Sequence, residues 1–277
     1  MAIEVVPLSA AIGAEVHGVN LSSPISNNQR QKLLDTWHEH LLILFRNQEL
    51  TDDDLLRSSD WIGPLGKRSR PADRRQEDDP YIMLVSNIRK NGEPIGSLPD
   101  GEMWFHHDTC YTDAPDKFTM LCALAIPKIG GNTMWSNMYQ AWETMPEGLK
   151  KTIRSKKALS VYDYATIEKP DLDNLEKIEK AWQPCVVTHP QTSREALFVN
   201  RLMTCQLEGL SIAESSTILD PIFDHAEQRQ FVYEHEWTVG DFIIWDNLAV
   251  THARTNFERG DDRRLRRSKV SGDSLVA

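Results

Sequence analysis

Short runs of hydrophobic and β-branched residues, separated by polar turns, dominate the chain from Tyr81 onward. Runs of this length and composition predict β-strands. The predicted strands are Tyr81–Val85, Thr109–Tyr111, Phe118–Ala125, Val186–His189, Leu197–Asn200, Phe231–Glu236, Asp241–Trp245 and Arg263–Val270. Two stretches have helical spacing instead: Tyr139–Ser155, interrupted at Pro146, and Ser211–His225, which opens with a Ser-x-x-Glu capping box. Many short strands with connections too long for hairpins favour a jelly roll with helices packed outside.

The first third of the chain mixes both patterns. Ile3–Pro7 predicts a strand, Ser26 can cap a helix that runs to about His40, and Leu41–Phe45 predicts a buried strand. A second helix is expected from Thr51 to near Gly63, because carboxylates in a first turn complement the helix dipole. We predict one domain over residues 1–277, mainly β with flanking helices, around a double-stranded β-helix (jelly-roll) core. The polar stretch at about 162–183 is expected to form an active-site loop, either an inert one or a lid.

Composition and charge exclude several kinds of partner. The net charge of −10 argues against nucleic acid, which requires basic surface. Apolar runs are too short to cross a bilayer, the N-terminus lacks the pattern of a signal peptide, and the four cysteines have no metal-ligand spacing. These features favour a reduced, cytoplasmic protein. The segment from Arg254 to Lys269 is strongly cationic, which indicates either a solvated tail or a surface for an anionic small molecule.

The chemistry suggested by the sequence centres on His106, Asp108 and His252. Residues two apart on an extended segment point to the same side, so His106 and Asp108 can bind one metal together. His107 competes as a ligand, but its side chain is expected to face the opposite way. His252 follows a predicted strand and supplies a second imidazole from far along the chain. Two histidines and one carboxylate on one face are the ligand set of non-haem Fe(II) that activates oxygen.

The sequence resembles the taurine/2,4-dichlorophenoxyacetate dioxygenase family of Fe(II)/2-oxoglutarate-dependent oxygenases over nearly its whole length. The resemblance is carried by an ordered set of phrases: Gly13–Leu21, Leu44–Gln48, His106-His107-Asp108, Gly130-Gly131-Asn132-Thr133, Thr188-His189-Pro190, Phe198-Val199-Asn200, Trp245-Asp246-Asn247…His252, and Arg263–Arg267 followed by Gly272-Asp273. Phe105 stands where a tryptophan is usual, and Asn132 where an aspartate is more common.

The resemblance implies that Fe(II), 2-oxoglutarate and O2 take part in the reaction. It assigns Arg263 and Thr133 to the far carboxylate of 2-oxoglutarate, which a guanidinium can bind through two parallel hydrogen bonds. Arg267 shares a strand face with Arg263 and is the candidate for a substrate's own acidic group. A register slip of one residue would bring Arg264 into the pocket instead. Because Asp108 is retained, hydroxylation is favoured over halogenation, which needs a small residue at that position.

The leading hypothesis is therefore a dioxygenase that hydroxylates a small, anionic organic substrate and releases succinate and carbon dioxide. Two alternatives remain: a metal-dependent hydrolase with the same three ligands, and a non-catalytic barrel that binds a small acid. Residues that select the substrate are expected in the loops Arg89–Met103 and Tyr162–Gln183. The resemblance also implies a homo-oligomer, a dimer or a tetramer.

Overall fold

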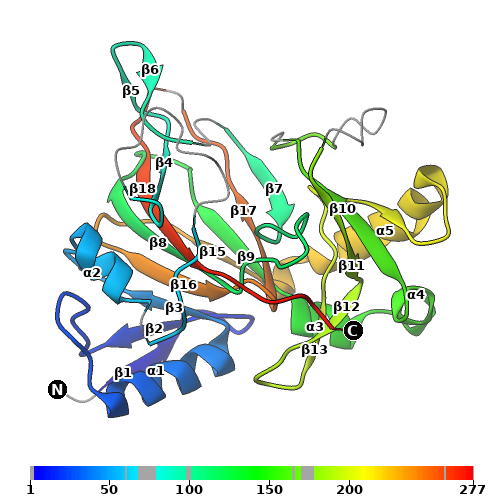
Figure 1. Ribbon diagram of the computed structural model, residues 1–277, viewed down its shortest axis with the longest axis horizontal. Helices are drawn as coiled ribbons and strands as arrows, with labels where there is room; N and C mark the ends of the chain where they lie inside the picture. The colour runs from blue at the N-terminus through cyan, green and yellow to red at the C-terminus, as the bar shows by residue number, and fades with distance from the viewer. Residues whose placement is uncertain are drawn as a thin grey trace.

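Two β-sheets face each other and form the core of the computed structural model, which describes residues 3–59, 61–67, 79–97, 101–163, 166–169, 178–258 and 260–276 (Figure 1). In these ranges the large sheet has the order β1 (Glu4–Pro7), β2 (Ala14–His17), β3 (Leu42–Phe45), β16 (Phe242–Asp246), β8 (Phe118–Ala125), β18 (Arg264–Val270) and β4 (Met83–Ser86). The small sheet has the order β15 (Val232–His235), β9 (Thr133–Asn137), β17 (Val250–Arg254) and β7 (Met103–His106). Neighbouring strands in both sheets are antiparallel except β2 and β3, which are parallel.

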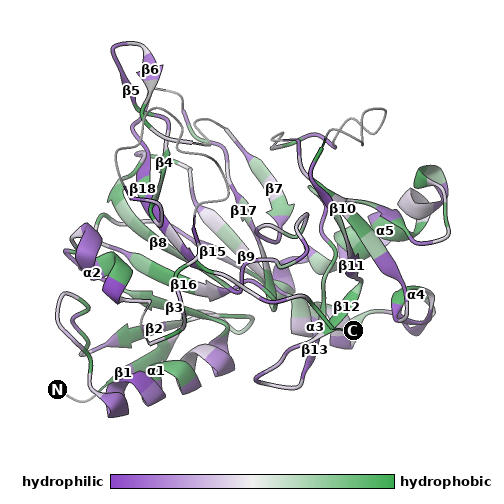
Figure 2. Ribbon diagram, viewed as in Figure 1, coloured by the Kyte–Doolittle hydropathy of each residue, from purple (hydrophilic) through white to green (hydrophobic). Residues whose placement is uncertain are grey.

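Alternation along the strands explains how the layers pack. In β16, Ile243 and Trp245 face the small sheet, where the ring of Trp245 lies 5.5 Å from that of Trp135. Phe242 and Ile244 of the same strand face the other way, into an outer cluster that includes Trp37 of helix α1 (Asn27–His40). A central strand that is covered on both faces is expected to be hydrophobic, and β16 is so over Phe242–Ile244, although it ends in the hydrophilic Asp246 (Figure 2). This fold is a jelly roll with flanking helices, as predicted.

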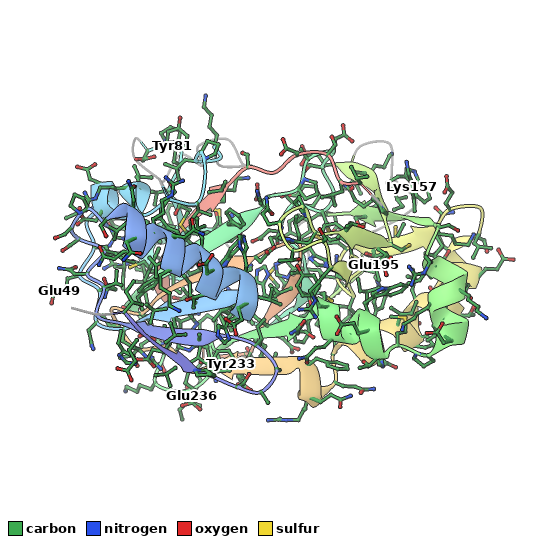
Figure 3. The ribbon with its side chains drawn as sticks, turned by 90° about the horizontal axis from the view of Figure 1, so that it is seen from below. Glu49, Tyr81, Lys157, Glu195, Tyr233 and Glu236 are labelled. Carbon is green, nitrogen blue, oxygen red and sulfur yellow. The ribbon has the colours of Figure 1, made fainter. Side chains whose placement is uncertain are left out.

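A second group of elements lies beside the open edge of the small sheet (Figure 1). It contains a sheet of β11 (Lys180–Pro184), β10 (Lys157–Val161) and β14 (Thr204–Leu207), and the hairpin of β12 (Val186–Thr188) with β13 (Glu195–Leu197). Helices α3 (Met138–Thr144), α4 (Glu147–Ile153) and α5 (Ile212–Ala226) complete it. Figure 3 shows Lys157 and Glu195 in this half, with Glu49 and Glu236 in the half that contains the large sheet. A short hairpin, β5 (Arg89–Lys90) and β6 (Glu93–Pro94), projects from the end of β4.

Local signals predicted several elements well. Helix α1 begins after Ser26, α5 begins after Ser211 with the expected capping box, and the predicted helix over Tyr139–Ser155 is divided at Pro146 into α3 and α4. Strand β8 has the predicted bounds. Among the described helices, none is both long and apolar enough to cross a membrane.

Three predicted elements differ from the structure. Thr109–Tyr111 is a turn rather than a strand, and Thr109 has a φ of 53°. Helix α2 (Asp52–Arg57) ends well before Gly63. The strand predicted at Leu197–Asn200 ends at Leu197, after which Asn200 caps a turn by accepting a hydrogen bond from the Met203 amide. At Thr109–Tyr111 a tertiary contact overrides local propensity, because the neighbouring Asp108 amide donates a hydrogen bond to Asn247 Oδ1.

Candidate metal and cosubstrate site

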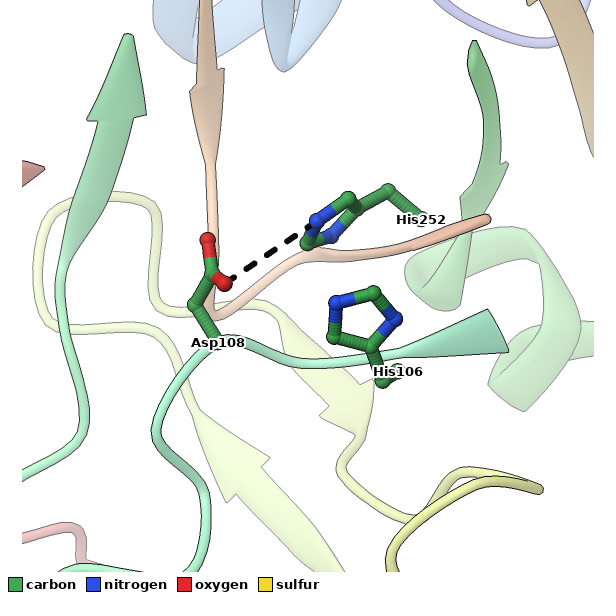
Figure 4. Close-up of side chains that lie close together, drawn as sticks. All are labelled: His106, Asp108 and His252. Carbon is green, nitrogen blue, oxygen red and sulfur yellow. Dashed lines mark ion pairs between the residues drawn. The ribbon is translucent and has the colours of Figure 1, made fainter. Parts of the chain in front are cut away.

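The three predicted metal ligands converge on one point of the small sheet. His106 is the last residue of β7 and is the register partner of His252 on β17, so the two imidazole centroids lie 4.1 Å apart. Asp108 follows two residues later, with its Oδ1 3.9 Å from His252 Nε2 (Figure 4). One donor atom from each of the three side chains lies within 4.8 Å of the others. Two imidazoles and one carboxylate at this spacing are compatible with a single iron ion.

A turn held by Asn247 aims Asp108 at the histidines. The Asp108 amide donates to Asn247 Oδ1 at 2.8 Å, and Asn247 Nδ2 donates to the Asp108 carbonyl at 2.9 Å. His107 points the other way, as alternation predicted. Its Nδ1–H donates to the Asn247 carbonyl at 2.9 Å, and its ring stacks on Phe198 with centroids 4.2 Å apart. His107 is fully buried in the core and therefore lies outside the site.

The protonation states suit metal binding. His106 Nδ1 lies 2.9 Å from the Trp104 carbonyl and must donate to it, which leaves Nε2 as the free donor atom. Burial lowers the pKa of His106 and lowers that of His252 further, so both rings are neutral near pH 7. Burial alone would raise the pKa of Asp108, but Arg267 and the two imidazoles outweigh it, and the pKa falls well below its usual range. The carboxylate is therefore ionised.

Arg267 contacts the metal carboxylate directly. Its Nη2 lies 2.8 Å from Asp108 Oδ2, which also accepts a hydrogen bond from Thr119 Oγ1 at 2.6 Å. A second buried carboxylate, Asp116, lies 3.8 Å from the same Nη2 and pairs with Lys269 Nζ at 2.8 Å. Arg267, which the sequence predicted to bind a substrate's acidic group, thus already lies beside two carboxylates of the protein. Asp116 and Lys269 have no motif spacing that would have revealed them in the sequence.

Arg263 and Thr133 lie together at another part of the same cavity. Both are 3% exposed, Arg263 Nε donates to the Gly131 carbonyl at 3.1 Å, and Thr133 Oγ1 accepts a hydrogen bond from Trp237 Nε1 at 3.0 Å. A Cβ at Gly131 would lie 3.2 Å from Arg263 Cδ, so the glycine allows the side chain to pass. The structure directs Arg263 inward, whereas Arg264 is not among the residues that line the cavity.

The remaining cavity wall is mostly apolar and comes from both sheets and their connections. It includes Met83, Val85, Met103, Tyr111, Leu121, Tyr162 and Met203. One further cation, Arg254, lines the cavity and was not selected from the sequence, where it was one of many basic residues in the segment from Arg254 to Lys269.

The two loops expected to select the substrate are described only in part. Residues 164–165 and 170–177 of the predicted active-site loop, and residues 98–100 of the other, lie outside the described residues. In the part that is described, the Trp104 amide donates to the Thr166 carbonyl at 2.9 Å, which joins the first of these loops to β7.

Comparisons with known proteins identify the family. The model of the taurine catabolism dioxygenase TauD, TfdA family matches residues 4–269, so the chain belongs to that family. It is 27% identical to an alpha-ketoglutarate-dependent 2,4-dichlorophenoxyacetate dioxygenase from Cupriavidus pinatubonensis, with 100% of both chains covered. It is also 27% identical to an alpha-ketoglutarate-dependent sulfate ester dioxygenase from Pseudomonas putida, over 99% of this chain and 91% of that one. A crystal structure of AAD-2 in complex with Mn(II) and N-oxalylglycine shares the fold, with a TM-score of 0.85, 22% identity and full coverage of both chains.

Proposed function

We propose that this protein is an Fe(II)- and 2-oxoglutarate-dependent dioxygenase that hydroxylates a small, anionic organic substrate. One oxygen atom of O2 enters the substrate C–H bond, and the other enters succinate as 2-oxoglutarate loses carbon dioxide. The observation that carries the proposal is the convergence of His106, Asp108 and His252 in a cavity that also contains Arg263 and Thr133. Membership of the dioxygenase family and the activities named for the relatives support it.

The residues of the chain have separable roles in this reaction. Iron held by His106, Asp108 and His252 supplies oxygen activation when it is bound. The neutral histidines and the ionised Asp108 need no proton rearrangement before they bind a cation. Arg263 holds the far carboxylate of 2-oxoglutarate, and Thr133 offers a hydroxyl beside it. Because both residues are almost fully buried, the ionic contact of Arg263 is stronger than it would be at the surface.

The substrate is proposed to combine an apolar body with an acidic group. The methionine, tyrosine and aliphatic side chains of the wall suit an apolar body. Arg267 lines the cavity beside the metal ligands, so it is our candidate for the substrate's acid, which would bind in addition to Asp108 and Asp116. Relatives named for phenoxy acids and sulfate esters fit this class of molecule. The loops at 89–103 and 162–183, the second of which can act as a lid, would complete the substrate site.

Anaerobic spectroscopy followed by turnover tests the proposal. Addition of Fe(II) and 2-oxoglutarate without oxygen should produce a weak violet charge-transfer band, and oxygen should then produce succinate. His106→Ala, Asp108→Ala and His252→Ala should each abolish both signals and retain the circular dichroism of the wild type. His107→Ala is the matched control, because its side chain faces the core, and it should retain the band. Substrate turnover that needs neither oxygen nor 2-oxoglutarate would support the hydrolase and contradict the proposal.

A further inference from the structure

Arg254 lies on the same face of β17 as His252. Residues two apart on a strand share a face, and the register pairs Arg254 directly with Thr133 of β9. Arg254 is 6% exposed and lines the same cavity as the metal ligands. A second guanidinium therefore reaches the end of the cavity where Thr133 and Arg263 lie.

Arg254 and Arg263 line the same cavity and approach the same aromatic ring. Their guanidinium carbons lie 5.6 and 6.0 Å from the centroid of a single ring, that of Phe257. Burial and the positive charge of Arg254 lower the pKa of Arg263 to about 9. Two buried like charges repel each other, and an anion in the cavity that both line would offset that repulsion.

We propose that Arg254 and Arg263 together form a two-guanidinium site for the far carboxylate of 2-oxoglutarate, and that Arg254 makes the enzyme select dicarboxylic over monocarboxylic 2-oxo acids. This inference rests on the proposed function. A single arginine with a hydroxyl is enough to bind a carboxylate. Arg254 adds a second positive charge beside the far end of the bound acid. A far carboxylate gains binding energy from this charge, whereas the uncharged end of a monocarboxylic acid of equal length does not.

Arg254 also joins the carboxylate site to the chain before β7. Its Nε donates to the Gly101 carbonyl at 2.8 Å. A purely structural role in holding Gly101 is therefore the competing explanation. Glutamine at this position removes the charge and keeps an N–H donor, whereas lysine keeps the charge. The two substitutions separate the two explanations.

Binding to the Mn(II)-loaded protein, measured by isothermal titration calorimetry, tests the inference without turnover. The probes are 2-oxoglutarate and 2-oxopentanoate, which has the same chain length but a methyl group in place of the far carboxylate. Arg254→Gln should weaken 2-oxoglutarate binding by about 10- to 100-fold, the size expected for a lost charge-assisted contact. It should change 2-oxopentanoate binding by less than about twofold, and Arg254→Lys should keep the preference for the dicarboxylate. The exposed Arg229, which lies outside the cavity and the two loops, provides the control, Arg229→Gln, which should match the wild type.

Thermal unfolding gives a second readout. 2-Oxoglutarate should raise the Tm of Arg254→Gln by less than it raises the Tm of the wild type. Equal losses for both acids would assign Arg254 to the support of Gly101 and overturn the inference. Wild-type affinity for 2-oxoglutarate in Arg254→Gln would also overturn it and leave the proposed function intact. A wild-type protein that binds neither acid would refute the proposed function itself.

Discussion

Replacing Asp116 by asparagine removes a buried carboxylate that lies between two cations. Asp116 is 3% exposed, its Oδ1 lies 2.8 Å from Lys269 Nζ, and its Oδ2 lies 3.8 Å from Arg267 Nη2. Arg267 keeps Asp108 as a partner after the substitution, at 2.8 Å. Lys269, itself 6% exposed, loses the carboxylate beside its ammonium group. The substitution therefore removes the carboxylate that Lys269 and Arg267 share and leaves Asp108 paired with Arg267.

The expected cost follows from burial rather than from the number of contacts. Removal of one partner from a buried ion pair typically costs about 3–5 kcal/mol, because the remaining charge is no longer compensated. Removal of both partners is often nearly neutral. We therefore expect Asp116→Asn to lower the free energy of unfolding by about 3–5 kcal/mol, out of a total of about 5–15 kcal/mol. The double variant Asp116→Asn/Lys269→Met should recover most of that loss.

Urea denaturation at pH 7, followed by circular dichroism, measures both variants on the metal-free protein. The same series in 0.5 M salt provides a control, since a buried pair is little screened and the difference should persist. If Asp116→Asn lowers the free energy of unfolding by less than about 1 kcal/mol, the Asp116–Lys269 pair behaves like a solvated surface ion pair, and the reasoning is refuted. A double variant as unstable as the single one would equally refute the reasoning.

Two further predictions concern the cosubstrate and the core. Arg263→Ala should weaken 2-oxoglutarate binding by about 30- to 1000-fold in anaerobic titrations, and Thr133→Val should have a smaller effect in the same direction; equal affinity in Arg263→Ala and wild type would remove the assignment. Burial lowers the pKa of His107 from 6.5 to about 4, so the stability that its neutral form contributes is complete above pH 6.5 and is lost as the pH falls through 4. Between pH 6.5 and pH 4, the free energy of unfolding of His107→Phe should therefore fall by up to about 3 kcal/mol less than that of the wild type, as measured by urea denaturation. Parallel profiles of unfolding free energy against pH for the two proteins would count against this account.

The sequence predicted features that depend on residues close together in the chain, such as helix caps and the alternation of side chains along a strand. Ser26 and Ser211 identify helix starts because each cap acts within three residues of itself. Alternation separated His106 from His107, since a strand allows only two directions, whereas the choice of Arg263 over Arg264 came from the family resemblance. The jelly roll followed from the number and spacing of the strands.

Features that depend on distant contacts were not predictable in this way. The run Thr109–Tyr111 has strand propensity, but Asn247 holds the chain in a turn there, from 139 positions away. Asp116 and Lys269 form a pair only because β18 lies beside β8. Arg254 was one basic residue among several until its register with Thr133 gave it a neighbour. Each of these contacts joins segments whose proximity is a property of the fold.

The cavity is built from two sheets that carry different parts of the site. His106 and His252 belong to the small sheet, while Arg267 belongs to the large sheet and Arg263 immediately precedes its strand β18. A molecule that contacts both the metal and Arg263 therefore bridges the two layers and acts as a non-covalent crosslink between them. Occupancy should then slow amide hydrogen exchange in β17 and β18 together, in strands that share no hydrogen bonds. The rigidity of the barrel thereby becomes a property of the loaded enzyme rather than of the chain alone.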